Sequence, residues 1–398
     1  MLQTPYEIRV CMDIGSSLHY AAIGLSSGEK ITGFTVKHTP EGIQDFFQKI
    51  KNIENQYGLP VSVAMEGYNG YARPIDTMVL DKGYKLFNVN NLKLSRFKEI
   101  FPAPAKTDEI DVWKIFEMFT MKDTLPLAKS ALQEVVKPPQ VNEKLKRITR
   151  RRRDIVIEKG QITNRLHADL ESICPGILSI TGSIDNIWFL KFLVSREDIT
   201  KLVGLQKTSI LKIKGVGKKY AAEIQNWQKT ATFSADTAWV GEMVIRDAKR
   251  VLELLKELAT LEKIIENLIP QSEIASRIMT LTGFGPICSA ELAGEIGEYS
   301  RFQKESSLAV YVGMGVLSNQ SGKYSGVRRL RCSNFRAKGA MMTATARHIA
   351  HNSEAKKYYD KKRAEGKKHN QAVRALGRHL IRVIWSMLKN KRDYLHKD

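Results

Sequence analysis

The chain has 398 residues, of which 43% are hydrophobic, so it is long and apolar enough for two or three folded domains. Its 63 lysines and arginines against 42 acidic residues give a formal net charge of +21, which favours nucleic acid as the partner. No segment approaches the run of about 18 apolar residues that spans a bilayer. The cysteines form no C-x-x-C pair, which argues against a zinc site or a disulfide framework. We expect all four to be reduced, namely Cys11, Cys174, Cys288 and Cys332.

The first residues have the pattern of a meander of short strands. Strands are predicted at Ile8–Ile14, Tyr20–Leu25 and Ile31–Val36, separated by turns that contain glycine and serine. The chain leads directly into the first strand, without the basic stretch and apolar core of a signal peptide. We therefore expect a cytoplasmic protein.

Strand and helix patterns then alternate. A helix is predicted from Pro40, a buried strand at Val61–Met65, a second helix at Pro74–Asp81 and a further strand at Tyr84–Val89. This order predicts an α/β layer whose later strands are parallel and joined by right-handed crossovers. The same order of elements is found in a ribonuclease-H-like fold.

From about Leu132 the strand pattern stops and long helices follow. Residues 141–172 and 236–268 have helical periodicity, and two such helices can pair as a coiled coil, within one chain or between subunits. The first helix contains the run Arg150-Arg151-Arg152-Arg153, for which a solvated helix face and contact with phosphate are equally good explanations. A last helix is predicted from about Gln371 to Leu388, after the basic residues Lys361-Lys362-Arg363 and Lys367-Lys368.

Two glycine pairs have the look of helix-hairpin-helix turns. They occur in Gly215-Val216-Gly217 and in Gly283-Phe284-Gly285. Paired glycines let backbone N–H groups at a helix N-terminus approach a phosphate, although a simple turn between helices shows the same residues. Two copies in so basic a chain favour contact with the DNA backbone.

Four carboxylates occur where an α/β sheet places its functional site. Asp13 ends the first strand, Glu66 follows the Val61–Met65 strand, and Asp108 and Asp111 lie three residues apart, on one face of any helix that begins there. Crowded carboxylates repel one another and favour Mg²⁺ or Mn²⁺. Each alone is also explained as a helix cap or a strand-end residue. The cations nearby, Lys106 and Arg73, could contact phosphate or solvent.

A serine lies in a basic segment near residue 320. Ser321, with Ser318 and Ser325 as neighbours, follows an apolar stretch, and a hydroxyl on a small flexible loop among cations suits attack on a phosphodiester. A serine–glycine pair beside lysine is also typical of a plain turn. No His–Asp pattern accompanies the serine, and His348 with His351 lacks a further metal ligand. The surrounding cations are Lys323, Arg328, Arg329, Arg331, Arg336 and Lys338.

These residues resemble the DEDD transposases and recombinases of insertion sequences, which include the pilin-gene inversion recombinases and the bridge-RNA-guided recombinases. The likeness spans nearly the whole chain and is based on V-C-M-D-I-G-S, A-M-E-G-Y-N-G-Y, A-K-T-D-E-I-D, and the segments from L-T-G-F-G-P-I-C through Q-S-G-K. The resemblance implies a RuvC-like domain at 1–130, a helical coiled-coil region at 131–270 and a C-terminal transposase domain at 271–398. At Ser333-Asn334 and Gly67-Tyr68 the sequence departs from the family's commoner residues. These departures bear on local contacts with DNA more than on the catalytic residues.

By the resemblance, Ser321 is the nucleophile that joins DNA covalently, and Asp13, Glu66, Asp108 and Asp111 hold the divalent metal. It also implies dimers and tetramers that combine the metal domain of one subunit with the serine domain of another, inside a bacterial or archaeal cell, and a structured guide RNA. Two other functions remain open: a junction-resolving nuclease in which the carboxylates activate water, and a non-catalytic scaffold that binds RNA or DNA.

Overall fold

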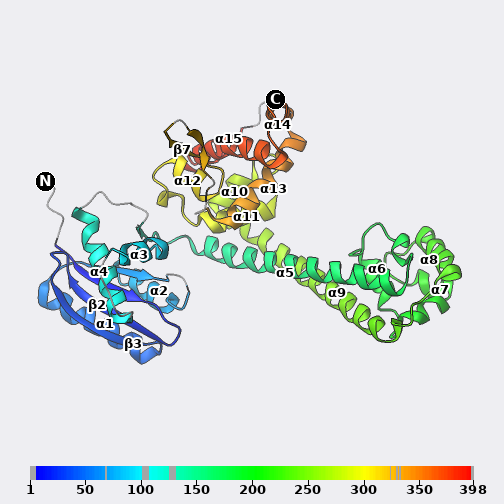
Figure 1. Ribbon diagram of the computed structural model, residues 1–398, viewed down its shortest axis with the longest axis horizontal. Helices are drawn as coiled ribbons and strands as arrows, with labels where there is room; N and C mark the ends of the chain where they lie inside the picture. Colours follow the sequence, from blue (N-terminus) through cyan, green and yellow to red (C-terminus); the bar gives the residue numbers. More distant parts are fainter. Residues whose placement is uncertain are drawn as a thin grey trace. The chain divides into compact units, whose positions relative to one another are not determined.

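The computed structural model describes residues 6–67, 70–100, 107–124, 131–322, 324–328, 330 and 333–395. The chain divides into two compact units, Met1–Lys137 and Pro138–Asp398 (Figure 1). No helix among these described residues is both long enough and apolar enough to cross a membrane.

The N-terminal unit contains a mixed sheet with the strand order β3-β2-β1-β4-β5-β6. β1 pairs antiparallel with β2 and parallel with β4, and β4 pairs parallel with β5, so the predicted meander and the parallel later strands are confirmed. Its strands are β1 (Ile8–Asp13), β2 (Leu18–Leu25), β3 (Lys30–Lys37), β4 (Val61–Glu66), β5 (Lys85–Val89) and β6 (Leu132–Glu134).

Helices cover both faces of this sheet. α1 (Pro40–Tyr57) and α2 (Arg73–Asp81) pack on the face that includes Val10 and Met12. α4 (Asp108–Thr124), with α3 (Asn91–Lys98) beside it, packs on the opposite face, which includes Cys11. This division follows from the alternation of side chains along a strand, because neighbouring residues point to opposite faces.

The prediction that strands stop near Leu132 was wrong. β6 begins at Leu132 and pairs antiparallel with β5, and a hairpin of β7 (Leu317–Ser321) and β8 (Tyr324–Arg328) lies far along the chain. The residues of β7 are all exposed, and β6 has only three residues. β7 has no buried face and β6 is too short to show a clear period of two, which is why the sequence pattern missed them.

The second unit is built on a long antiparallel helix pair. α5 (Gln140–Ile173) and α9 (Thr237–Leu268) lie side by side (Figure 1). They correspond to the two long helices predicted at 141–172 and 236–268. Their exposed faces are joined by ion pairs such as Arg165–Asp247 and Arg250–Glu158. Of the two pairings that the sequence left open, the structure shows the one within a single chain.

Two apolar cores form around this helix pair. Residues from Ile155 onward in α5 pack with α9 as far as Leu261 and with the helices between them. The start of α5 instead joins the core of the last helices, in which α15 buries an apolar stripe over the region predicted as Gln371–Leu388. The remaining helices are α6 (Ile187–Leu193), α7 (Lys207–Leu211), α8 (Lys218–Thr230), α10 (Glu273–Met279), α11 (Pro286–Ile296), α12 (Glu305–Tyr311), α13 (Phe335–His351), α14 (Ser353–Ala364) and α15 (His369–Lys389), with short 3₁₀ helices η1 (Ile177–Ile180), η2 (Ile199–Gly204), η3 (Ile269–Gln271) and η4 (Tyr299–Arg301).

Candidate functional site

Two of the predicted carboxylates lie side by side at the ends of neighbouring parallel strands. Asp13 is the last residue of β1 and Glu66 the last of β4, and their Cα atoms are direct partners in the register of the two strands. Residues at odd positions in β1 and even positions in β4, such as Cys11 and Ala64, face α4. By the same alternation Asp13 and Glu66 belong to the α4 face of the sheet.

The other two carboxylates lie in the first turn of α4, which packs on that face. α4 begins at Asp108, and Asp111 follows one turn later, with its backbone N–H donating to the carbonyl of Thr107 at 3.0 Å. The helix is held against β1 by Arg9, whose Nη1 donates to the Phe119 carbonyl at 2.8 Å. The fold therefore brings the N-terminus of α4 to the strand ends that bear Asp13 and Glu66.

The electrostatics indicate that three of these acids, Asp13, Asp108 and Asp111, lie near one another. Burial raises the pKa of Asp13 above its ordinary range, and the nearby charges of Asp108 and Asp111 raise it further. Lys98 at the end of α3 acts in the opposite direction, and its Nζ lies 2.9 Å from Oδ2 of Asp111. The sequence had not singled out Lys98, because its position becomes informative only once α3 and α4 pack together. Among the residues described, no three acidic, histidine or cysteine side chains are close enough to hold one ion as they stand.

The predicted nucleophile is exposed on the β7–β8 hairpin. Ser321 is the last residue of β7, its Cα is paired with that of Tyr324, and the turn between the strands includes Gly322 with a φ of 55°. The residue therefore ends a strand, whereas the sequence suggested an irregular flexible loop. Ser318 and Ser325 lie in the same hairpin and are also exposed.

The predicted basic residues around the serine are described only in part. Arg328 ends β8, and Arg336 and Lys338 lie in the first turn of α13. Arg336 stacks its guanidinium on Phe335, 4.6 Å from the ring centroid, and the stem of Lys338 packs against Gly313. Outside the described residues lie Lys106, Lys323, Arg329, Arg331 and Cys332.

The arginine run in α5 is paired with acids on two neighbouring helices. Arg150 and Arg153 make bidentate hydrogen bonds, each with both bonds between 2.7 and 2.8 Å, to Glu295 and Glu291 of α11. Arg151 and Arg152 pair with Glu257 and Glu262 of α9. Each arginine thus has a structural role in packing helices, and contact of Arg150 and Arg151 with nucleic acid stays a prediction. Glu291 and Glu295, which sequence reasoning missed, lie in an apolar stretch that gave no hint of their partners.

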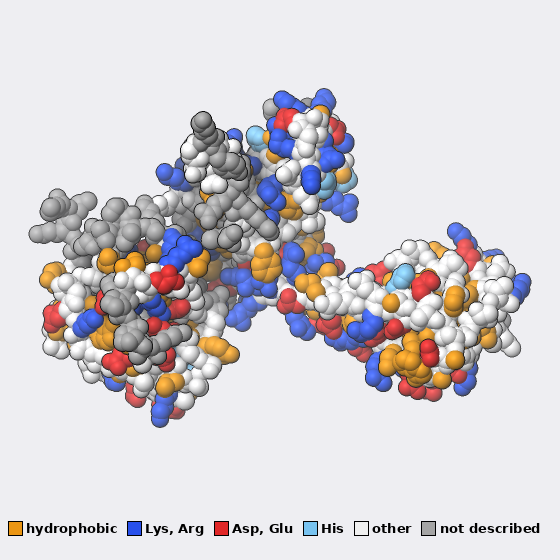
Figure 2. Space-filling model, in the orientation of Figure 1, with side chains coloured by type: hydrophobic (Ala, Val, Ile, Leu, Met, Phe, Trp, Pro, Cys, Tyr) orange, Lys and Arg blue, Asp and Glu red, His pale blue; other side chains and the backbone are white. Residues whose placement is uncertain are grey.

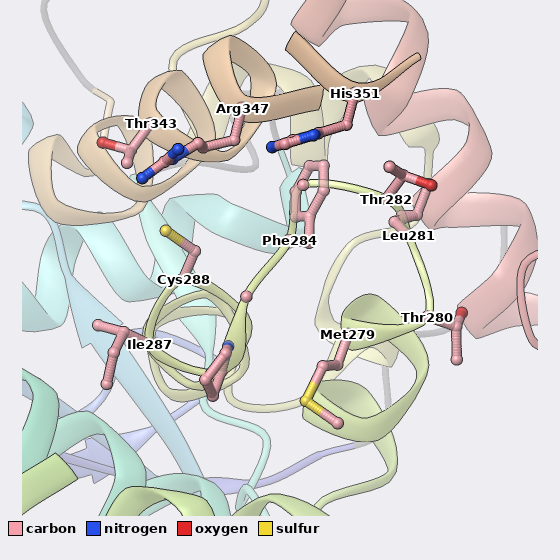
Figure 3. A pocket seen from close by; sticks show the side chains of 13 residues that line it. Met279, Thr280, Leu281, Thr282, Phe284, Ile287, Cys288, Thr343, Arg347 and His351 are labelled. Carbon is pink, nitrogen blue, oxygen red and sulfur yellow. The ribbon is translucent and has the colours of Figure 1, made fainter. Parts of the chain in front are cut away.

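The second glycine pair forms a tight turn beside an open pocket. Gly283 has a φ of 85°, and a Cβ there would lie 2.4 Å from the backbone nitrogen of His348, so only glycine fits. Arg347 and His351 of α13 extend over the turn that leads into α11 (Figure 3). Nδ1 of His348, in α13, is 2.7 Å from the carbonyl oxygen of Thr282. This hydrogen bond holds the turn against α13.

Basic side chains also gather around one of the last helices of this unit. Figure 2 shows Lys and Arg side chains crowded around α14, whose last turn contains Lys361, Lys362 and Arg363.

The cysteines that the structure describes are not reactive groups of the site. Cys11 and Cys174 are buried thiols, and Cys288 is half-buried. Burial raises the pKa of Cys174 to about 11, so this thiol stays protonated and unreactive at neutral pH.

Comparison with known proteins identifies the family. A family model described as a transposase matches residues 10–175, and one described as a transposase of the IS116/IS110/IS902 family matches residues 275–360. A 44.8 kDa protein of insertion element IS116 from Streptomyces clavuligerus is 22% identical over 97% of this chain and 96% of its own length. A 42 kDa protein of IS900 from Mycobacterium paratuberculosis is 23% identical over 96% of each chain. A 43.6 kDa protein of IS110 from Streptomyces coelicolor is 21% identical over 96% of this chain and 94% of its own length. Because transposase family models match segments in both units, the chain belongs to the DEDD family of insertion-sequence transposases.

Proposed function

We propose that this transposase cuts and rejoins DNA through a covalent phosphoserine intermediate at Ser321, aided by a divalent metal. The observation that supports this proposal best is the presence of two different reactive groups in one basic chain. One is the set of carboxylates on the α4 face of the sheet, and the other is the exposed Ser321 hydroxyl on the hairpin. Family membership makes DNA the substrate.

The carboxylate set fits Mg²⁺ or Mn²⁺ in its chemistry. Its donors are hard oxygen atoms from Asp13, Glu66, Asp108 and Asp111, and the raised pKa of Asp13 reflects burial and the repulsion from neighbouring carboxylates that a cation would relieve. The ammonium group of Lys98 already balances part of this charge. When bound, the metal would supply Lewis-acid stabilisation of charge on the phosphodiester oxygens.

The serine step needs a nucleophile, cations that stabilise the transition state, and a second reaction that frees the serine again. Oγ of Ser321 attacks the phosphorus and loses its proton, while the bond to one bridging oxygen breaks and that DNA end leaves with a hydroxyl group. Arg336 and Lys338 at the start of α13 are placed near the hairpin in sequence and add positive charge for the transition state. Attack by the hydroxyl of another DNA end on the phosphoserine re-forms a phosphodiester and frees the serine.

The N-terminal unit supports a RuvC-like assignment within this proposal. A three-stranded meander followed by parallel strands, with acids at the ends of β1 and β4, is the arrangement expected of a ribonuclease-H-like nuclease core. The proposal further includes a dimer or tetramer that joins the carboxylates of one subunit to Ser321 of another. It also includes a structured guide RNA, for which the net charge of +21 supplies the electrostatic attraction.

The test of the chemistry compares two serines in one hairpin. Ser321→Ala should abolish protein–DNA adducts that survive denaturation and lower strand exchange by roughly 10⁴-fold or more, the scale for loss of a nucleophile. Ser325→Ala, which removes a hydroxyl from the facing strand, is the matched control and should keep both activities. Undiminished cutting by Ser321→Ala would instead support the alternative, a metal-dependent junction-resolving nuclease.

The RNA part of the proposal has its own test. The protein is purified from cells that carry its whole insertion element, and the nucleic acid that comes with it is sequenced. One discrete small RNA is expected. Recovery of DNA alone, or of cellular RNA in proportion to its abundance, would remove the guide RNA from the proposal and leave the serine chemistry standing.

A further inference from the structure

A polar cluster around the fully buried Glu295 closes the base of the segment that contains Ser321. This segment runs from the end of α12 at Tyr311 to Asn334, the N-cap residue of α13. The backbone N–H of Asn334 donates to the carbonyl of Tyr311 at 2.7 Å, so the two ends of the segment meet directly. The two ends of the segment that contains the serine hairpin are therefore held at one point.

Asn334 uses its whole side chain at this point. Its Oδ1 accepts hydrogen bonds from the backbone N–H groups of Arg336 and Ala337, at 3.0 and 3.1 Å, and so caps α13. Its Nδ2 donates to Oε2 of Glu295 at 2.7 Å and to the hydroxyl of Tyr311 at 2.9 Å. The Tyr311 hydroxyl donates in turn to the carbonyl of Glu295 at 2.7 Å.

Glu295 connects this point to the long helix α5. Its side chain is 0% exposed, and its carboxylate accepts the bidentate pair from Arg150. Although burial alone would raise the pKa of Glu295, the hydrogen bonds from Arg150 and Asn334 hold it below the ordinary value, so the group is ionised. An ionised, fully buried carboxylate with this set of partners tolerates little movement of any of them.

We infer that Asn334 is a positioning residue for the reaction: through Glu295 and Tyr311 it fixes both ends of the Ser321 segment relative to α5. This inference rests on the proposed function of Ser321. A capping residue alone needs only an acceptor oxygen, which Ser or Asp supplies equally well. The amide is required here because it caps the helix and donates to Glu295 and Tyr311 at the same time.

The charged groups around Glu295 define what a pH experiment measures. Lys146, Arg150 and Arg153 face it from α5, and Arg301 lies over the ring of Tyr311. Glu291 is one turn earlier in α11 and is paired with Arg153. In Asn334→Asp the new carboxylate would face Glu295 without a donor between them, and the two acids would have to share a proton.

The experiment compares three variants of the full chain, with adduct formation measured between pH 6 and pH 9. Asn334→Asp keeps the cap but should lower the adduct yield roughly 100-fold at pH 8, the scale for a displacement of about 1 Å in a reacting group. Its yield should recover as pH falls, because a shared proton restores the donor. Asn334→Ser keeps the cap without a charge and should show the loss without the recovery.

Asn352→Asp is the matched control, because Asn352 caps α14 through Oδ1 with Ala355 N–H at 2.8 Å. It should behave as the wild type throughout. Hydrogen exchange of the β7–β8 amides supplies a readout that does not depend on chemistry, and it should be faster in Asn334→Asp than in Asn352→Asp. Equal exchange in these two variants, or a loss in Asn334→Asp that does not depend on pH, would overturn the inference. A wild type that forms no adduct would overturn the proposed function instead.

Discussion

At the scale of single residues, the acids proposed to bind the metal lower the stability of the fold. Burial and the nearby Asp108 and Asp111 raise the pKa of Asp13, so ionisation of Asp13 opposes folding. A raised carboxyl pKa means that the stabilising contribution of the protonated group is fully present at low pH and is lost as pH rises through the raised value. At neutral pH charge repulsion remains at this site, and a bound cation would relieve it.

This repulsion predicts a variant that is more stable but inactive. In chelator, Asp13→Asn should melt at a higher temperature than the wild type at pH 8, and the difference should shrink toward pH 4, where the wild-type carboxyl is protonated. Adduct formation with metal should fall by roughly 100-fold or more. Calorimetry from pH 4 to pH 8 makes the measurement, and Asp45→Asn on the exposed face of α1 is the control. A lower melting temperature for Asp13→Asn at pH 8 would contradict the expected repulsion.

At the scale of helices, ion pairs of one type contribute different amounts to stability according to how deeply they are buried. Arg153 and Arg165 both extend from α5 to make bidentate pairs. Arg153 is 32% exposed and its partner Glu291 7%, whereas Arg165 is 57% exposed and its partner Asp247 13%. Removing Arg153 leaves the buried Glu291 carboxylate without its cation, whereas Arg165 is exposed enough that water and salt already screen its attraction to Asp247.

We therefore expect unequal losses of stability from two matched substitutions. Arg153→Ala should lower the free energy of unfolding by about 2 to 3 kcal/mol, a value reduced from the fully buried case because the arginine is partly exposed. Arg165→Ala should cost less than about 1 kcal/mol. Urea unfolding at low and high salt distinguishes them, and equal costs for the two would show that burial of Glu291 has no energetic consequence.

Close packing of α11 on α5 depends on one glycine. A Cβ at Gly294 would lie 2.5 Å from the backbone nitrogen of Lys146, so α11 approaches the backbone of α5 itself. Gly294→Ala should cost about 1 to 3 kcal/mol of unfolding free energy, because the rigid helix backbones must separate. Gly160→Ala in α5, where a Cβ meets nothing within 4 Å, should raise stability by up to about 1 kcal/mol. Thermal melts of both variants check the pair, and a neutral Gly294→Ala would rule out the close approach.

At the scale of the whole molecule, the two reactive groups lie in separate compact units. The carboxylates are in Met1–Lys137 and Ser321 is in Pro138–Asp398. If each site is shared between two subunits, two inactive variants should complement each other. An equal mixture of Asp13→Asn and Ser321→Ala dimers that exchange subunits should recover about a quarter of the wild-type sites. Strand-exchange assays of the mixture test this, and a mixture as inactive as its parts would place the site within one chain.

The sequence alone was sufficient for the elements with strong periodicity and for the positions of the acids along them. Buried faces mark the first two strands of the meander, the parallel strands, the long helices at 141–172 and 236–268 and the last helix, and burial is what gives a sequence its period. For the same reason Asp13 and Glu66 could be placed at strand ends.

Only the tertiary structure decided which side chains meet. It showed that α4 brings Asp108 and Asp111 to the face of Asp13, that Lys98 pairs with Asp111, and that the arginines of α5 pair with Glu291 and Glu295. It also placed Ser321 in a hairpin, whose strand β7 is exposed throughout and has no buried face to mark it in sequence. Local periodicity reports the face that each element buries, whereas contacts between elements distant in sequence depend on how those faces are packed together.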